Sequence, residues 1–129
     1  MQSWTVLAMD DSAEILNLLR CHLQSQALVL VASSGEVGLA TAVEARPDLV
    51  FLDHALSGMQ GLEVCRVLKQ DPRTAHIPVV FLTTRGEERH LQEFQRAGAA
   101  RVINKPFTRQ EVLTACRDLA LRHGAGGCA

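Results

Sequence analysis

The chain has 129 residues, a length that predicts a single domain. Hydrophobic residues make up 47% of it, which allows a substantial core and excludes a disordered chain. The formal net charge of −1 argues against general affinity for nucleic acid or for an anionic membrane surface. The sequence contains no apolar run of about 18 residues and begins without a basic stretch and cleavage site, so we expect no transmembrane helix and no signal peptide.

The four cysteines lie far apart in the sequence and form no CxxC pair. They are Cys21, Cys65, Cys116 and Cys128. This spacing favours buried free thiols in a reducing compartment over a disulfide framework or a zinc site. We therefore expect a cytoplasmic protein.

Five short apolar runs have the composition of buried β-strands. They cover residues 4–9, 27–32, 48–52, 77–82 and 99–103. In the third run, Leu49, Val50, Phe51 and Leu52 precede Asp53 without a polar residue, which predicts a strand buried on both faces.

Each run is followed by a segment with apolar residues at helical spacing. These predicted helices begin near residues 11, 33, 62, 84 and 108, and they end near residue 26, before Pro47, at Asp71-Pro72, at Gly98 and near residue 119. Four of them open with the spacing of a capping box, in which Glu follows a Ser, Thr or Asp three residues later. The four pairs are Asp11 with Glu14, Ser33 with Glu36, Thr84 with Glu87, and Thr108 with Glu111.

Alternation of five strands with five helices predicts an α/β fold with a doubly wound parallel sheet, because right-handed crossovers place the helices on both faces. In such a sheet, binding sites form outside the carboxyl ends of the strands. Four of the predicted strands end in side chains with useful chemistry. These are Asp10 and Asp11 after the first strand, Asp53 after the third, Thr83 after the fourth and Lys105 after the fifth.

Three carboxylates at one sheet edge repel one another unless a cation neutralises them. Oxygen ligands without Cys or His at these strand ends favour Mg²⁺ over zinc. A hard dication beside a carboxylate, with an ammonium and a hydroxyl nearby, suits phosphoryl transfer. Asp53 is the carboxylate that remains to attack, which would give an aspartyl phosphate, whereas Asp10 and Asp11 would mainly carry the metal.

Each of these residues has a simpler interpretation when it is taken alone. An Asp after a strand is usually a turn former or a helix cap, and Asp11 can combine capping with metal binding. Thr83 alone is more often a cap, and Lys105 alone is more often a solvated surface charge. His54 is interpreted as a partly exposed surface residue.

Taken in order, the motifs closely resemble the receiver domain of two-component response regulators. The matching features are the pair Asp10-Asp11, Asp53 within FLDHALSGMQGLEV, Thr83 after VVFL, and Lys105-Pro106-Phe107. The resemblance covers residues 4–122 and implies a flavodoxin-like strand order, 2-1-3-4-5, as in the family's chemotaxis regulator. We expect a receiver domain over residues 1–122 and a flexible tail over residues 123–129.

The resemblance implies that Asp53 accepts a phosphoryl group from a sensor histidine kinase or a histidine phosphotransfer protein. Asp11, Asp53 and the backbone carbonyl of Ala55 would ligate Mg²⁺, with Asp10 helping through water. Such a domain is not an enzyme in the ordinary sense, because it catalyses only its own phosphorylation and dephosphorylation.

The resemblance also assigns roles to the hydroxyl and the ammonium. Thr83 would bond a phosphoryl oxygen once it arrives. Lys105 would pair with Asp53 before phosphorylation and with the phosphate afterwards. The Lys105-Pro106 bond is expected to be cis, as in the family.

The implied output is a switched surface that binds a downstream effector protein or domain. We expect no direct nucleic-acid or membrane partner, and either a monomer or a phosphorylation-dependent dimer. The family's usual aromatic switch residue, three positions before the Lys, is Val102 here. This departure keeps open an alternative, a phosphorylation-independent interaction module of the same fold. An aspartyl phosphatase is disfavoured, because it would need an Asp where this chain has Ala55.

Overall fold

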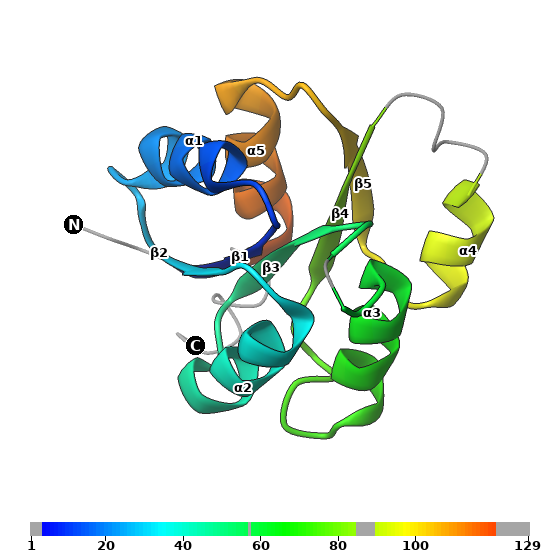
Figure 1. Cartoon of the computed structure of the whole chain (residues 1–129). Coiled ribbons are helices and arrows are strands. Elements are labelled where there is room, and N and C mark those ends of the chain that lie inside the picture. Colours follow the sequence, from blue (N-terminus) through cyan, green and yellow to red (C-terminus); the bar gives the residue numbers. More distant parts are fainter. Residues whose placement is uncertain (1–3, 57, 85–89, 121–129) are drawn as a thin grey trace.

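Five parallel strands form the centre of the computed structural model, which describes residues 4–56, 58–84 and 90–120 (Figure 1). The strands are β1 (Trp4–Met9), β2 (Ala27–Ala32), β3 (Leu49–Asp53), β4 (Val79–Thr83) and β5 (Arg101–Asn104). Their order in the sheet is β2-β1-β3-β4-β5, with every neighbouring pair parallel. The predicted fold class and strand order are confirmed.

Helices cover both faces of the sheet (Figure 1). They are α1 (Ala13–Leu23), α2 (Gly35–Ala45), α3 (Gly61–Gln70), α4 (Leu91–Arg96), α5 (Arg109–Ala115) and the π-helical turn η2 (Cys116–Ala120). One core joins α1 and α5 to the sheet through residues such as Leu19 and Val112. A second core joins α2, α3 and α4 to the opposite face through Ala42, Val64 and Phe94.

The central strands are buried as the sequence predicts. All five residues of β3 and all five of β4 are buried, because helices lie over both faces of these strands. The polar side chains at the ends of β3 and β4 are therefore held at the edge of an apolar interior. Within the part of the chain that the structure describes, no helix is long and apolar enough to cross a bilayer.

The capping residues of the first two helices are each one position later than predicted. Ser12, rather than Asp11, accepts the N–H of Ile15 at the start of α1. Ser34, rather than Ser33, accepts the N–H of Val37 at the start of α2. A hydroxyl caps a helix only when its backbone is extended and the next residue is already helical, and this is decided by the path of the loop.

Other predicted bounds are confirmed or shifted by small amounts. The capping box of Thr108 with Glu111 is present at the start of α5. The last three strands begin and end one or two residues later than expected, and α1 ends at Leu23. The pair of Thr84 with Glu87 and the tail over residues 123–129 fall on or extend into residues outside the described part. Cys65 and Cys116 are buried thiols, whereas Cys21 is exposed on α1, which corrects that prediction.

The loop after α3 completes the hydrogen bonds of the helix end. Residue 72 is Pro, which has no N–H to donate to the carbonyl of Leu68 four residues earlier. The buried hydroxyl of Thr74 donates to that carbonyl at 2.7 Å instead. The Lys69 ammonium donates to the carbonyls of Ala75 and Ile77 at 3.1 and 2.6 Å. The last turn of α3 is thus tied to the segment that enters β4.

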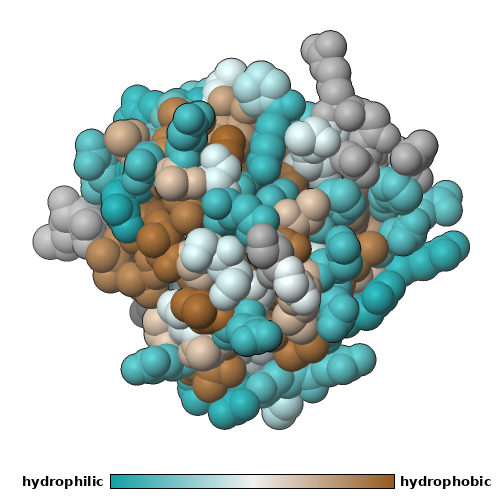
Figure 2. Space-filling view, in the orientation of Figure 1, coloured by the Kyte–Doolittle hydropathy of each residue, from teal (hydrophilic) through white to brown (hydrophobic). Residues whose placement is uncertain are grey.

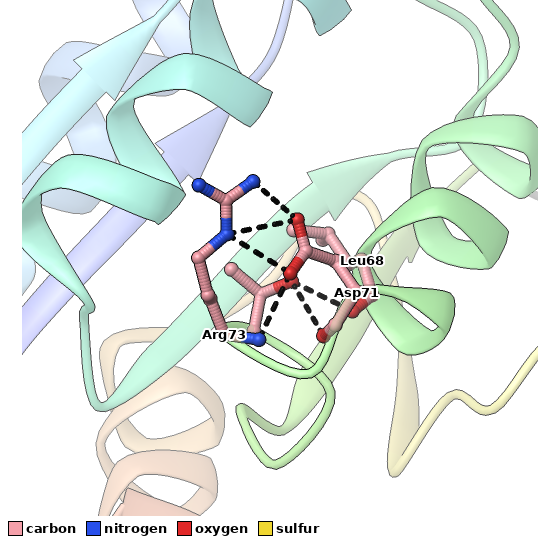
Figure 3. A network of polar contacts seen from close by, with 4 residues as sticks. Leu68, Asp71 and Arg73 are labelled. Atoms are coloured by element: carbon pink, nitrogen blue, oxygen red, sulfur yellow. Dashed lines mark hydrogen bonds and ion pairs between the residues drawn. The ribbon is translucent and has the colours of Figure 1, made fainter.

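Arg73 forms an exposed ion pair with Asp71 in the same loop (Figure 3). The guanidinium approaches the carboxylate through two nitrogens, at 3.1 and 2.8 Å. Hydrogen bonds from Arg73 to the carboxylate hold the pKa of Asp71 at about 2. Because water competes for both charged groups, the pair is expected to contribute less to stability than the buried hydroxyl of Thr74.

We expect Thr74→Val to lower the free energy of unfolding by about 1 kcal/mol, because the buried Leu68 carbonyl loses its donor while the shape is kept. Urea denaturation followed by circular dichroism measures the change. Thr74→Ser keeps the hydroxyl, and Arg73→Ala removes only the exposed ion pair. Each should lower the free energy of unfolding by less than Thr74→Val does. A Thr74→Val protein as stable as the wild type would contradict this account of the helix end.

Candidate functional site

Four strands bring polar side chains to one edge of the sheet. Asp10 directly follows β1, Asp53 ends β3, Thr83 ends β4, and Lys105 directly follows β5. The registers place Asp53 beside Leu82 and Thr83 beside Asn104, so the ends of β3, β4 and β5 lie at the same level. This is the edge at which the sequence predicts a site.

The ammonium of Lys105 lies between two carboxylates that come from different strands. Its Nζ is 2.8 Å from Oδ2 of Asp10 and 3.3 Å from Oδ1 of Asp53. The predicted pairing of Lys105 with Asp53 is present, and the shorter contact with Asp10 was not anticipated. The Lys105 backbone N–H donates to the carbonyl of Thr83, and the Lys105-Pro106 bond is cis, as expected.

The two carboxylates differ in their access to solvent. Asp10 is 1% exposed, whereas the side chain of Asp53 is 13% exposed. One oxygen of Asp10 accepts the N–H of Ser12 at 2.9 Å, and Oδ1 of Asp53 accepts the N–H of Ala55 at 3.3 Å. Backbone donors from the two following loops therefore fix both side chains, but only Asp53 offers surface to an incoming group.

Burial and charge shift the ionisation of this cluster. Burial, followed by the negative charge of Asp10, raises the pKa of Asp53, and Lys105 together with the N–H of Ala55 offsets only part of this rise. Burial alone would lower the pKa of Lys105, but the carboxylates of Asp10 and Asp53 outweigh it and raise that pKa. Lys105 is accordingly held as a cation opposite the carboxylates.

The donor set fits a hard cation. Oδ2 of Asp10 is fully buried, and the Lys105 ammonium lies 2.8 Å from it. Asp11, the next residue after Asp10, and Ala55, whose N–H donates to Asp53, are both exposed. No group of three or more His, Cys, Asp or Glu side chains within the described ranges could by itself hold a metal ion. Mg²⁺ keeps several waters and needs only one or two protein carboxylates, so this finding is compatible with Mg²⁺ at this edge.

The hydroxyl of Thr83 has a partner that the sequence analysis missed. Thr83 is buried, and its Oγ1 donates to Oδ1 of Asn104 at 2.8 Å. Asn104 lies at the end of β5, immediately before Lys105, so its place at a strand end was the available signal. This bond fixes the direction of the hydroxyl at the edge of the site.

His54 connects the site to α4 through ring contacts. It is partly exposed, as predicted, but its ring also meets Phe94 of α4 edge-on with centroids 5.7 Å apart. Phe94 in turn stacks on Phe81 of β4 at 4.6 Å, and Phe81 pairs with Val102 of β5. The residue after Asp53 is therefore in contact with α4 through the buried ring of Phe94.

We expect two charge-removing variants to move the pKa of Asp53 in opposite directions. Asp10→Asn should lower it because the repulsion is lost, and Lys105→Met should raise it because the attraction is lost. The measurement is an NMR titration of the Asp53 side-chain carboxyl carbon in metal-free buffer. Equal shifts in the same direction would contradict the arrangement of these three charges.

Comparisons with known proteins agree with this geometry. The family model described as the response regulator receiver domain matches residues 6–117. The chain is 34% identical over 123 residues to the phosphate regulon transcriptional regulatory protein PhoB of Pseudomonas aeruginosa, which covers 95% of this chain and 54% of that protein. The chain spans about half the length of this relative and of the transcriptional regulatory protein ResD of Bacillus subtilis.

Solved structures share the fold. A putative response regulator from Chloroflexus aurantiacus superimposes with a TM-score of 0.87 at 28% identity, covering 92% of this chain and 98% of that one. The receiver domain of the sensor histidine kinase PA1611 from Pseudomonas aeruginosa has a TM-score of 0.83 at 19% identity, covering 91% and 97%, and that structure holds a magnesium ion in its active site cleft. At this identity the second similarity concerns the fold alone.

Proposed function

This chain belongs to the response regulator receiver domain family of two-component signal transduction, and from that premise we propose that it is phosphorylated on Asp53 by a histidine kinase or a histidine phosphotransfer protein. One observation carries the choice of residue. Of the two carboxylates that contact Lys105, only Asp53 has exposed side-chain surface, 13% against 1% for Asp10. A nucleophile must reach its substrate, so Asp53 is assigned the attack and Asp10 the supporting charge.

The proposed reaction moves a phosphoryl group from the imidazole nitrogen of a phosphohistidine to a carboxylate oxygen of Asp53. The new P–O bond forms as the P–N bond breaks, and the released electron pair stays on the imidazole. Lys105 lies 3.3 Å from the Asp53 carboxylate, where its ammonium can balance the negative charge of the transferred group. The Thr83 hydroxyl, which now donates to Asn104, is proposed to turn to a phosphoryl oxygen when that group arrives.

We assign Mg²⁺ to the same edge. Asp11, Asp53 and the backbone carbonyl of Ala55 are the proposed ligands, with Asp10 acting through water. When bound, the ion would neutralise charge on the phosphoryl oxygens. The support is the chemistry of the donor set, because the carboxylates of Asp10 and Asp53 meet at this edge and offer only oxygen ligands.

We expect the wild type to gain the mass of one phosphoryl group when it is incubated with a small acyl phosphate and Mg²⁺, because the carboxylate acts as the nucleophile. Intact-protein mass spectrometry measures the gain. Asp53→Asn should show none, whereas Asp71→Asn, an acid in the loop after α3, should react like the wild type. Equal phosphorylation of the Asp53→Asn protein would reject this phosphoacceptor.

Metal binding is tested separately from phosphorylation. We expect Mn²⁺, used as a paramagnetic substitute for Mg²⁺, to broaden the NMR signals of the loops after β1 and β3. Asp11→Asn should weaken this binding roughly tenfold or more, because one negative ligand is lost. Asp71→Asn is the control and should bind Mn²⁺ like the wild type. Broadening centred on other parts of the chain, or wild-type binding by the Asp11→Asn protein, would place the metal outside this edge.

A second candidate function is suggested by Val102. The partly buried Val102 lies on β5 at the position where the family usually has an aromatic residue, so the usual output mechanism lacks its side chain. The alternative is a phosphorylation-independent interaction module. A downstream effector that binds the phosphorylated and unphosphorylated forms equally would favour it, and a difference in affinity would favour the switch.

A further inference from the structure

The outer edge of β2 has unusual composition for an exposed strand. β2 is the last strand on its side of the sheet and pairs with β1 alone among the described residues. Its sequence, ALVLVA, contains no charge, no proline and no glycine. Edge strands of monomeric proteins normally carry such residues, because an uninterrupted apolar edge invites another strand to pair with it.

The backbone of β2 offers alternate groups to that edge. The carbonyl of Gln26, directly before β2, accepts the N–H of Trp4 in β1, and the carbonyl of Ala32 accepts the N–H of Asp10, directly after β1. Backbone groups alternate sides along a strand, so the even-numbered residues of β2 face β1. The N–H and carbonyl groups of Ala27, Val29 and Val31 therefore point away from the sheet.

Apolar side chains surround these groups. Leu28 is 47% exposed and Val31 is 36% exposed. Figure 2 shows hydrophobic surface gathered over the position of β2, at the left of the view. A hollow of about 200 Å³ lies beside the strand, lined by Arg20 of α1, by Gln24 directly after α1, and by Ala27, Leu28 and Val29.

We propose that β2 pairs antiparallel with β2 of a second copy of this chain, about a two-fold axis perpendicular to the sheet. Such an axis keeps the faces of the two sheets continuous. An odd-numbered residue can therefore pair only with an odd-numbered residue, and an even-numbered residue only with an even-numbered one. In the register centred on Val29, Ala27 of each copy pairs with Val31 of the other. All the residues in these pairs have outward backbone groups.

The side chains fit this register. Ala27, Val29 and Val31 share the α1 face of the sheet, and the small Ala27 borders the hollow there. The exposed Val31 of the second copy would lie opposite Ala27 and enter that hollow. On the other face, Leu28 of each copy would lie opposite Leu30, an apolar cross-strand pair. The strand is thus complementary to itself, which favours a second copy over an unrelated partner.

Sedimentation analysis of the unphosphorylated protein tests this pairing. The wild type should form dimers as its concentration is raised, and Val31→Lys should remain monomeric at the same concentrations, because an edge lysine blocks strand pairing. Leu28→Lys is the second variant, in case the first does not fold by circular dichroism. Val67→Lys, at an exposed valine of α3 with 39% exposure, is the matched control and should dimerise like the wild type.

Amide hydrogen exchange gives an independent readout. The N–H groups of Val29 and Val31 should be protected at high concentration and lose protection on dilution, whereas that of Leu30, which faces β1, should stay protected throughout. A wild type that stays monomeric, a Val31→Lys dimer, dimers without this protection, or polymers of growing length would each overturn the proposal. The experiment uses no phosphoryl donor, so its result is separate from that of the phosphorylation test.

Discussion

The carboxyl edge of the sheet depends on the contacts of the Lys105 ammonium with two carboxylates. The ammonium meets carboxylates from β1 and β3 at 2.8 and 3.3 Å, at the edge of an apolar interior. Burying two like charges without a counter-charge would be strongly unfavourable, and one carboxylate would then take up a proton. The loop after β5, which supplies this cation, therefore keeps the cluster negative enough to receive a metal or to act as a nucleophile.

Apolar packing of β3 and β4 fixes the strand ends that carry the site. β3 and β4 are buried throughout, so their ends have little freedom to move. His54, the residue after Asp53, packs on Phe94 of α4, and Phe94 stacks on Phe81. Any displacement of the β3 end would meet α4 through these rings. These ring contacts do not use the side chain of Val102. The start of α3 is also tied to the end of β3, because the N–H of Gly61 donates to the carbonyl of His54 at 2.9 Å.

The two ends and the side edge of the sheet have separate physical characters. The carboxyl edge is charged. At the opposite end, Thr74 donates to the helix carbonyl that Pro72 leaves without a donor, and Lys69 donates to carbonyls of the segment that enters β4. The outer edge of β2 is apolar and carries outward backbone groups. Because β2 contributes no side chain to the charged cluster, pairing along it and chemistry at Asp53 can proceed without competing for the same residues.

Local patterns in the sequence determined much of this protein. The apolar runs located all five strands within about two residues, and strand-helix alternation predicted the parallel sheet, because these features follow from burial and from chain direction. The rule that parallel strands present their carboxyl ends at one edge was enough to group Asp10, Asp53, Thr83 and Lys105. The order of the strands came from family resemblance and not from the residues themselves.

Only the tertiary structure decided how those residues meet. The family resemblance implied that Lys105 pairs with Asp53, but the fold also places Asp10 against the ammonium and buries it more deeply than Asp53. Asn104 as the partner of Thr83, and Ser12 rather than Asp11 as a cap, depend on side-chain directions set by loops that pack against distant elements. Distances of this kind are fixed by contacts between residues far apart in the chain, and a pattern along the chain carries no information about them.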